Sequence, residues 1–212
     1  MKKILTPCEA LKQPDGDFLT GLYWRHFPIS EKCRNVNNQG KSGKLRSLRY
    51  TSMRSKKNAT SEEEFIYSHF LSMLDAARCA AESEYTRLCI EKVDGMNILF
   101  AIAEFENGIA AEFELNECLP DSMPDTCFVK GNYTDGHVTN QPIVGHFNEE
   151  GLIFADDDSM HQIIAENGTS PAAEGPFGWM KLRFEIKAER GEIPSGKQDI
   201  EKLAALIERN LK

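Results

Sequence analysis

Three groups of residues have types and spacings that could do chemistry: a glycine-lysine-serine turn, an acidic triplet and five histidines. The turn lies in "NNQGKSGKLRS" (residues 37–47), where Gly40, Lys41 and Ser42 match the end of a phosphate-binding loop. Such a loop also needs a glycine five residues before Gly40 and a buried strand in front of it. Asn35 stands at that position, and the preceding segment is polar. We therefore interpret this segment as a turn between two elements.

The acidic triplet and three of the histidines are potential metal ligands, but their spacing matches no known site. The triplet at residues 156–158 lacks the alternating ligands and central glycine of a calcium loop. We interpret it as an exposed turn before a helix, whose N-terminus favours acidic residues. His137, His146 and His161 follow neither a helical nor a hairpin register. The sequence therefore predicts no metal site.

His26 and His69 differ from the other histidines because both lie among apolar residues. A histidine in such a place is most often a core residue whose ring nitrogens are hydrogen-bonded. It can also be a binding or catalytic group, because imidazole gains or loses a proton near neutral pH. Both interpretations stay open at this point.

Composition excludes several classes of protein. The 212 residues are 41% hydrophobic and 27% charged, as in soluble globular proteins, and their net charge of −8 opposes nucleic-acid binding. No apolar run approaches the roughly 18 residues of a membrane helix, and the N-terminus lacks the apolar core of a secretory signal. The six cysteines form no C-x-x-C pair. We expect a cytoplasmic protein with reduced thiols and no nucleic-acid or membrane partner.

The pattern of apolar residues predicts helices at both ends of the chain and strands in the middle. Two turn dipeptides, Asp94-Gly95 and Asn107-Gly108, predict a meander of three antiparallel strands. The predicted strands are Phe18–His26, Leu45–Arg54, Tyr85–Val93, Met96–Glu106, Ile109–Asn116, Thr126–Lys130, Gln141–Phe147 and Leu152–Ala155. The predicted helices are Pro28–Asn38, Ser61–Ala81, Ser159–Glu166 and Gln198–Leu211. This order indicates an α+β fold in a single domain, residues 1–212.

Local signals add detail to these helices. Ser30 is a potential N-cap of the first, and Ser61 to Glu64 form a capping box before the second. Spacings of three and four residues predict the buried positions Phe65, Ile66, Phe70, Met73, Leu74 and Ala77, and later Ile200, Leu203, Ala204 and Ile207. The segment Phe177–Arg190 fits both periods, and its alternation with charged residues favours a strand.

Several segments, in this order, resemble the second domain of Gfo/Idh/MocA oxidoreductases. "GLYWRHFPISEKCRNVNNQGKSGKLRSLRY" is similar to the entry of that domain, where a strand ends in Arg-Arg-Phe before a helix and a G-x-x-G-K turn. Arg25, His26 and Phe27 stand at the Arg-Arg-Phe positions, and Gly40 begins the turn. "NILFAIAEFENGIAAEFEL" and "VKGNYTDG" resemble the following strands, and "FEIKAERGEIPSGKQDIEKLAALIE" resembles the closing helices.

The resemblance implies an open, mostly antiparallel β-sheet with helices packed on one face, as in the C-terminal domain of glyceraldehyde-3-phosphate dehydrogenase. It also implies a helix over Phe177–Arg190. The family's N-terminal Rossmann domain, which binds NAD(P), has no counterpart in the sequence. We therefore expect no cofactor bound by this chain alone, and NAD(P) only where a partner chain supplies a Rossmann domain.

Two catalytic positions of the family are altered. "TPCEAL" (residues 6–11) resembles the family's C-E-K-P junction, but Ala10 replaces the lysine that assists proton transfer. The family also has an aspartate four residues before a helical histidine. His69 matches that histidine, whereas Phe65 stands at the aspartate position. Glu64 is adjacent but points about 100° away around a helix.

These departures favour a binding, accessory or regulatory protein for a sugar-like or polyol-like molecule. The alternative is the substrate-domain subunit of a split oxidoreductase with a separate NAD(P)-binding chain, and a purely structural role stays open. The resemblance places ligand-binding candidates at Arg25, His26, Glu64, Tyr67 and His69, with His69 as the candidate catalytic residue. We also expect a homo-oligomer that associates through the open sheet face, since exposed apolar sheet surface is unfavourable in water.

Overall fold

The computed structural model describes residues 2–14, 16–141, 151–156, 160–164, 175–193 and 196–211. Its strands are β1 (Lys3–Leu5), β2 (Phe18–Thr20), β3 (Leu45–Ser55), β4 (Tyr85–Lys92), β5 (Ile98–Phe105), β6 (Ala110–Leu119), β7 (Thr126–Tyr133), β8 (Gly136–Thr139), β9 (Gly151–Asp156) and β10 (Met160–Ile164). Its helices are α1 (Pro7–Leu11), α2 (Pro28–Gln39), α3 (Glu62–Glu64), α4 (Leu71–Ala81), α5 (Gly175–Glu189) and α6 (Lys197–Asn210). Shorter helical segments are η1 (Tyr23–His26), η2 (Lys56–Asn58) and the π-helical η3 (Phe65–Phe70).

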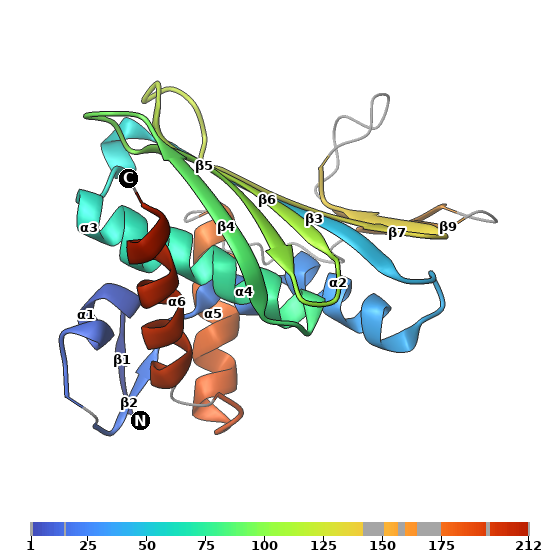
Figure 1. The fold of residues 1–212 in the computed structure, drawn as a ribbon, viewed down its shortest axis with the longest axis horizontal. Coiled ribbons are helices and arrows are strands. Elements are labelled where there is room, and N and C mark those ends of the chain that lie inside the picture. Colours follow the sequence, from blue (N-terminus) through green and yellow to red (C-terminus); the bar gives the residue numbers. More distant parts are fainter. Residues whose placement is uncertain are drawn as a thin grey trace.

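Eight strands form one open sheet in the order β10-β9-β8-β7-β3-β6-β5-β4. Neighbouring strands are antiparallel except for β3 and β6, which are parallel. The helices all lie on one face of this sheet (Figure 1). The expected fold class, an open and mostly antiparallel sheet covered on one face, is therefore confirmed, as is the three-stranded meander β4-β5-β6.

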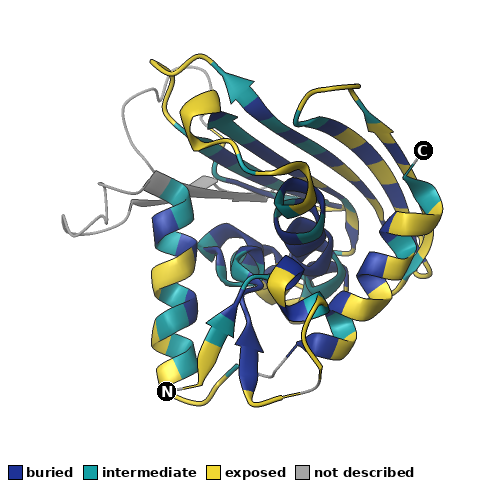
Figure 2. Ribbon diagram, turned by 90° about the vertical axis from the view of Figure 1, so that its left-hand side faces the viewer, coloured by how far each residue is buried: buried dark blue, intermediate teal, exposed yellow. Residues whose placement is uncertain are grey.

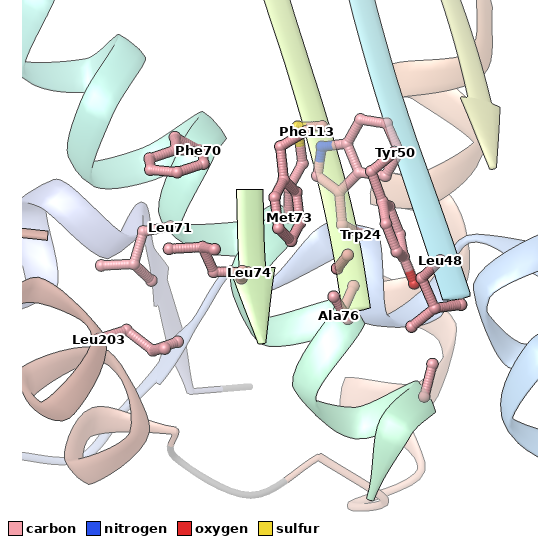
Figure 3. Packing of buried hydrophobic residues seen from close by; sticks show 14 of the residues in the cluster. Trp24, Leu48, Tyr50, Phe70, Leu71, Met73, Leu74, Ala76, Phe113 and Leu203 are labelled. Carbon is pink, nitrogen blue, oxygen red and sulfur yellow. The ribbon is translucent and has the colours of Figure 1, made fainter. Parts of the chain in front are cut away.

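The hydrophobic core lies between the sheet and the continuous helix formed by α3, η3 and α4 (Figure 3). Tyr50 of β3 stacks on Phe113 of β6, with ring centroids 5.9 Å apart, and Phe70 meets Phe113 edge-on. Alternating buried and exposed residues along the strands show which sheet face carries this layer (Figure 2). Every core position predicted on the two main helices is buried: Phe65, Ile66, Phe70, Met73, Leu74, Ala77, Ile200, Leu203, Ala204 and Ile207.

The capping signals are borne out in part. Ser61 caps the long helix by accepting a hydrogen bond from the Glu64 amide at 3.3 Å, while the Glu64 carboxylate accepts one from the Thr6 hydroxyl at 3.1 Å. The helix ends at Ala81, as predicted. The prediction that Ser30 caps α2 is wrong. The N-cap position is occupied by Phe27, and Ser30 lies inside the helix, where it is buried.

The predicted strand Phe18–His26 is wrong beyond Thr20. Its first part is β2, which pairs in parallel with β1, and the chain then turns at Gly21, where the Leu22 amide bonds back to the Thr20 carbonyl at 2.8 Å. A β-carbon on Gly21 would lie 2.7 Å from the tip of the Tyr23 side chain, which would have to shift to make room for it. The aromatic residues that follow form the turn η1 instead of extending the strand.

The predicted helix Ser159–Glu166 is also wrong, because Met160–Ile164 is strand β10. So short a helix gains little from its own hydrogen bonds, whereas β9 offers a complete antiparallel partner. Strand β8 was not predicted. The predicted strand Gln141–Phe147 lies, apart from Gln141, outside the described residues, as do His146 and most of the acidic triplet.

The ambiguous segment 177–190 is helical, as the resemblance implied, and forms most of α5. Met180 and Phe184, four residues apart, are buried, whereas Leu182 and Ile186 are exposed. The helical spacing therefore describes the buried face, and the alternation does not. Within the described ranges, no helix is long and apolar enough to cross a membrane.

The glycine-lysine-serine segment is a turn between α2 and β3. Gly40 ends the helix in the left-handed region at φ 66°, and Gly43 has φ 70°. A β-carbon on Gly40 would meet no atom, whereas one on Gly43 would overlap the side chains of Thr134 and Asp135. The glycines therefore reverse the chain, as expected.

Gly43→Ala should consequently destabilise the protein more than Gly40→Ala. Each change incurs about 1–2 kcal/mol for a left-handed backbone, and overpacking adds about 1–3 kcal/mol at Gly43 only. Urea unfolding of both variants measures the difference. Equal losses would show that the contact with Thr134 and Asp135 relaxes without cost.

Candidate functional site

A cavity of about 710 Å³ lies on the helical side of the sheet, between η3, α5 and the segment that leads into α1. A cavity of this size can enclose a small organic molecule. Its apolar wall consists of Pro7, Gly21, Tyr23, Trp24, Met123, Pro124, Phe177, Gly178 and Met180. Its polar lining consists of Thr6, Arg54, Lys57, Asn58, Glu64, Ser68, His69, Ser72, Asp125 and Lys181.

The long helix supplies four of the polar groups. Glu64, Ser68 and Ser72 recur every four residues and so share one face. The wider π-helical turn, a feature frequent at functional sites, brings the neighbouring His69 to the same cavity. Ser68 accepts a hydrogen bond from the Cys8 amide at 3.1 Å and Ser72 accepts one from the Trp24 amide at 3.4 Å, which ties the cavity walls to this helix.

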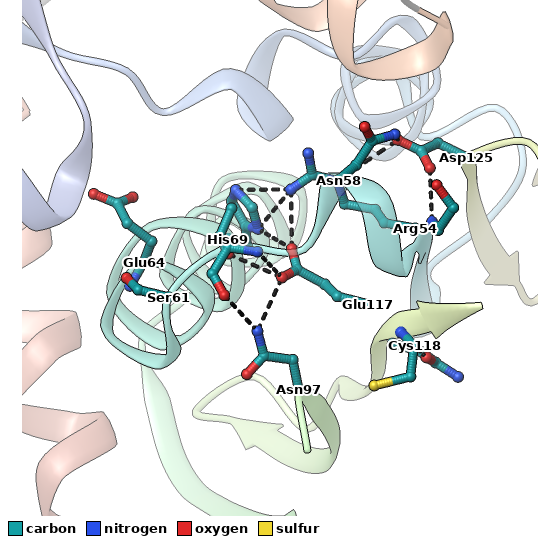
Figure 4. A network of polar contacts seen from close by, with 12 residues as sticks. Arg54, Asn58, Ser61, Glu64, His69, Asn97, Glu117, Cys118 and Asp125 are labelled. Atoms are coloured by element: carbon teal, nitrogen blue, oxygen red, sulfur yellow. Dashed lines mark hydrogen bonds and ion pairs between the residues drawn. The ribbon is translucent and has the colours of Figure 1, made fainter. Parts of the chain in front are cut away.

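His69 is paired with a carboxylate that comes from the sheet. Its Nδ1 lies 2.8 Å from Oε1 of Glu117 on β6 (Figure 4). Because an ionised carboxylate only accepts, Nδ1–H is the donor, and a neutral His69 carries its lone pair on Nε2. The His69 side chain is 26% exposed and that of Glu117 only 3%. Glu117 therefore fixes the tautomer of a histidine at the cavity wall.

Glu117 is itself held by five hydrogen bonds (Figure 4). Besides His69, the donors are Nη1 of Arg54 (2.9 Å), the amide and hydroxyl of Thr60 (2.8 and 2.9 Å) and Nδ2 of Asn97 (3.1 Å). Burial alone would raise the pKa of Glu117, but the hydrogen bond from His69, with the Thr60 amide and the Arg54 charge, lowers it to about 2. Glu117 is therefore a carboxylate at neutral pH.

Arg54 of β3 lies against His69, and both side chains line the cavity. Its Nη1 is 3.3 Å from both ring nitrogens of His69, which is possible only over the ring face. The guanidinium carbon also lies 4.9 Å from the centre of the Phe177 ring, and Nε lies 3.7 Å from Asp125. Arg54 thus joins α5, the sheet and the loop before β7 around one charged group.

Of the five residues predicted to bind a ligand, Glu64 and His69 line the cavity and Arg25 does not. Two hydrogen bonds join Arg25 to the fully buried Asp75 of α4, one of them 2.7 Å from Nε, and Nη2 lies 3.3 Å from Asp199 of α6. Asp75 and Asp199 therefore hold Arg25 in a link between two helices and η1.

His26 and Tyr67 also lie apart from the cavity. His26 Nδ1 is 3.5 Å from both Glu31 and Lys187, and its ring meets Phe184 edge-on at 5.5 Å. Tyr67 is half-buried and packs against the hydrophobic core. We expected Arg25 or His26 to line the cavity together with Glu64 and His69. Only the two residues of the long helix, Glu64 and His69, do so. From the η1 turn, Tyr23 and Trp24 reach the cavity instead.

The residues at the two positions where the resemblance implies a catalytic lysine and aspartate lie in the core. Ala10 and Phe65 are fully buried, and neither lines the cavity. Sequence reasoning missed Glu117, Arg54, Lys57, Asp125 and Lys181. One signal was present for Glu117: along β6 the inward positions 111, 113 and 115 are apolar, and Glu117 follows in the same register. Within the described ranges, no three or more His, Cys, Asp or Glu residues are placed to hold a metal ion.

The chain shares its fold with solved oxidoreductases. It is similar to an oxidoreductase from Agrobacterium radiobacter in complex with NAD+, L-tartaric acid and magnesium (TM-score 0.65, 15% identity, 90% of this chain and 60% of that one). It is also similar to an inositol dehydrogenase homologue from Azotobacter vinelandii in complex with NADH and myo-inositol (0.60, 12%, 91% and 62%). A third match is an oxidoreductase from Sinorhizobium meliloti (0.58, 14%, 95% and 65%).

The chain thus spans about 60% of the length of these proteins. No protein-family model and no curated protein sequence matches it. At these identities the likeness establishes the fold, which is the one that the resemblance implied. The activities of those oxidoreductases enter below only as support for a proposal.

Proposed function

We propose that this chain binds a small polyhydroxylated molecule in the cavity beside His69. The observation that carries the proposal is the contact of Glu117 with His69, a residue of the cavity wall. With Nδ1 committed to Glu117, the Nε2 atom of a neutral His69 is an acceptor for a ligand hydroxyl. Tyr23, Trp24 and Phe177 offer aromatic surface of the kind that the apolar face of a sugar or polyol covers.

The ligands of two proteins with this fold agree with that chemistry. One was solved with myo-inositol and another with L-tartaric acid, and both molecules carry several hydroxyl groups. We propose a binding, accessory or regulatory role as the primary function, because Ala10 and Phe65 replace the catalytic lysine and aspartate that the resemblance implies.

The His69–Glu117 pair favours a second candidate, the substrate domain of an NAD(P)-dependent oxidoreductase. A histidine backed by a carboxylate can accept the proton of a reacting hydroxyl while NAD(P), held outside these 212 residues, takes the hydride. The two candidates differ in one measurement. Ligand-dependent reduction of NAD(P)+, in the presence of a nucleotide-binding domain, supports the second, and binding without any reduction supports the first.

His69→Ala should weaken binding of a polyhydroxylated ligand about tenfold or more, because losing a hydrogen bond to a buried polar group costs about 1–3 kcal/mol. Thermal-shift and calorimetric titrations with myo-inositol, sugars and sugar acids measure the affinity. His137→Ala is the matched control, since His137 is bonded to Asn132 and does not line the cavity. If His69 is only a core residue, the change lowers the melting temperature and no compound stabilises the wild type.

We also propose a homo-oligomer formed through the sheet face opposite the helices. On β5 this face exposes two large apolar side chains, Phe100 (48%) and Ile102 (59%), which are unfavourable in water unless they are covered. Light scattering at micromolar concentration should give more than one chain per particle, and Ile102→Arg should lower the number of chains per particle. A wild-type monomer would contradict the proposal.

A further inference from the structure

We infer that the ligand of the cavity is a polyhydroxylated carboxylate rather than a neutral polyol. This inference rests on the proposed function and deepens it. It comes from the hydrogen-bonding partners of the charged groups around the cavity, which leave donors and positive charge for a ligand to satisfy.

Two of the three carboxylates at or behind the cavity wall, Asp125 and Glu117, are engaged by the protein at both oxygens. Asp125 accepts hydrogen bonds from the Ser55 amide at 2.8 Å and from Asn58 Nδ2 at 3.0 Å. Glu64 accepts one from the Thr6 hydroxyl at 3.1 Å. Glu117 lies behind His69 and is fully occupied, and with Asp125 it neutralises Arg54. Asp125 and Glu117 therefore offer few free acceptors to a ligand, whereas Glu64 keeps one oxygen, Oε2, without a partner in the described part of the chain.

The positive charges of the two lysines at the cavity, in contrast, are not balanced by a carboxylate of the described part of the chain. Lys57 donates one hydrogen bond, to the carbonyl of Asp121 at 3.1 Å, and its ammonium group keeps two further donors. Lys181 lies on α5 with its side chain exposed. Neither lysine forms an ion pair with a carboxylate in the described part of the chain, so both charges are available to a ligand.

A carboxylate satisfies this arrangement better than a hydroxyl does. A polyol hydroxyl is both donor and acceptor, whereas a carboxylate only accepts and brings the opposite charge. A hydrogen bond from an ammonium group to a carboxylate joins two opposite charges, whereas one to a hydroxyl is assisted by a single charge. The hydroxyl groups of the same molecule remain suited to His69 Nε2 and to the Ser68 and Ser72 hydroxyls at the cavity wall.

Calorimetric titrations with matched pairs of ligands test the inference: D-gluconate against D-glucitol, D-glucuronate against D-glucose, and L-tartrate against L-threitol. In at least one pair the acid should bind about tenfold more tightly at low ionic strength, and added salt should reduce that ratio. Lys181→Gln and Lys57→Gln should each lower the acid-to-neutral ratio about threefold or more, since each removes one charge from the site. Lys41→Gln, an exposed change in the turn before β3, should leave the ratio unchanged.

The outcomes separate this inference from the proposed function. If neutral partners bind as tightly as the acids in every pair, the inference fails and the proposed function stands. A preference for acids that survives both lysine substitutions also overturns the inference, because groups other than these lysines would then bind the carboxylate of the ligand. If no compound of the three pairs binds, both the inference and the proposed function fail.

Discussion

Glu117→Gln is expected to lower the free energy of unfolding by about 3–5 kcal/mol near neutral pH, the range for breaking a buried ion pair. The carboxylate accepts five hydrogen bonds. Glutamine replaces one acceptor oxygen by an NH2 group, which is a donor and would face groups that are themselves donors. Arg54 and His69 would then lack their charged partner in a half-buried place. Urea unfolding of the purified variant measures the loss.

A second substitution on the same strand serves as the control. Glu112 of β6 pairs with Arg49 at 2.5 Å, and both side chains are more than half exposed. Glu112→Gln should therefore cost less than about 1 kcal/mol, as exposed ion pairs usually do. If Glu117→Gln costs no more than Glu112→Gln, the buried network contributes little to stability.

The stability lost in Glu117→Gln should also depend on pH. The pKa of Glu117 is about 2 in the folded protein, below its ordinary value of 4.5. A depressed pKa means that the stabilisation is fully present above pH 4.5 and is lost as the pH falls through 2. The difference between wild type and Glu117→Gln should therefore shrink as the pH is lowered through this window. A difference that stays constant would show that size or packing, not charge, sets the cost.

The elements that the sequence predicts well are those whose signals are local. Spacings of three and four residues place the buried face of α4 and of α6, and Asp94-Gly95 and Asn107-Gly108 fix the meander because each dipeptide determines its own turn. Met160–Ile164 fails for the opposite reason. Five apolar-rich residues fit either period, and pairing with β9 decides between them.

The residues of the candidate site likewise differ in whether local sequence signals can predict them. His69 can be found from its helix, because the helix and its register are local properties. Glu117, its partner, lies 48 positions away, and the two meet only because β6 lies beneath η3 in the folded sheet. Arg25 shows the reverse error: the resemblance placed it among the ligand-binding residues, yet the buried Asp75 of α4 holds it by two hydrogen bonds, and Asp199 adds a third contact.

Asp75→Asn is the second change for which we expect a large loss, about 3–5 kcal/mol of unfolding free energy. Asp75 is fully buried and accepts hydrogen bonds from Arg25, one of them at 2.7 Å, and from Arg78 at 3.5 Å. Burial disfavours the Arg25 charge, but the hydrogen bonds and attraction of Asp75 outweigh it and raise the Arg25 pKa. Asparagine keeps the size of the side chain and removes the charge, so two guanidinium groups lose their buried partner.

Asp199→Asn is the matched control, because Asp199 contacts Arg25 and Arg78 at 3.3 and 2.8 Å but its side chain is 31% exposed. We expect that change to cost about 1 kcal/mol or less. A double-mutant cycle with Arg25→Leu and Asp75→Leu should show a combined loss well below the sum of the single losses, since removing both partners leaves fewer unpaired charges. Equal costs for Asp75→Asn and Asp199→Asn would contradict the prediction. Because Arg25 anchors the turn that carries Tyr23 and Trp24, Asp75→Asn should also weaken ligand binding in the cavity, where Asp199→Asn should not.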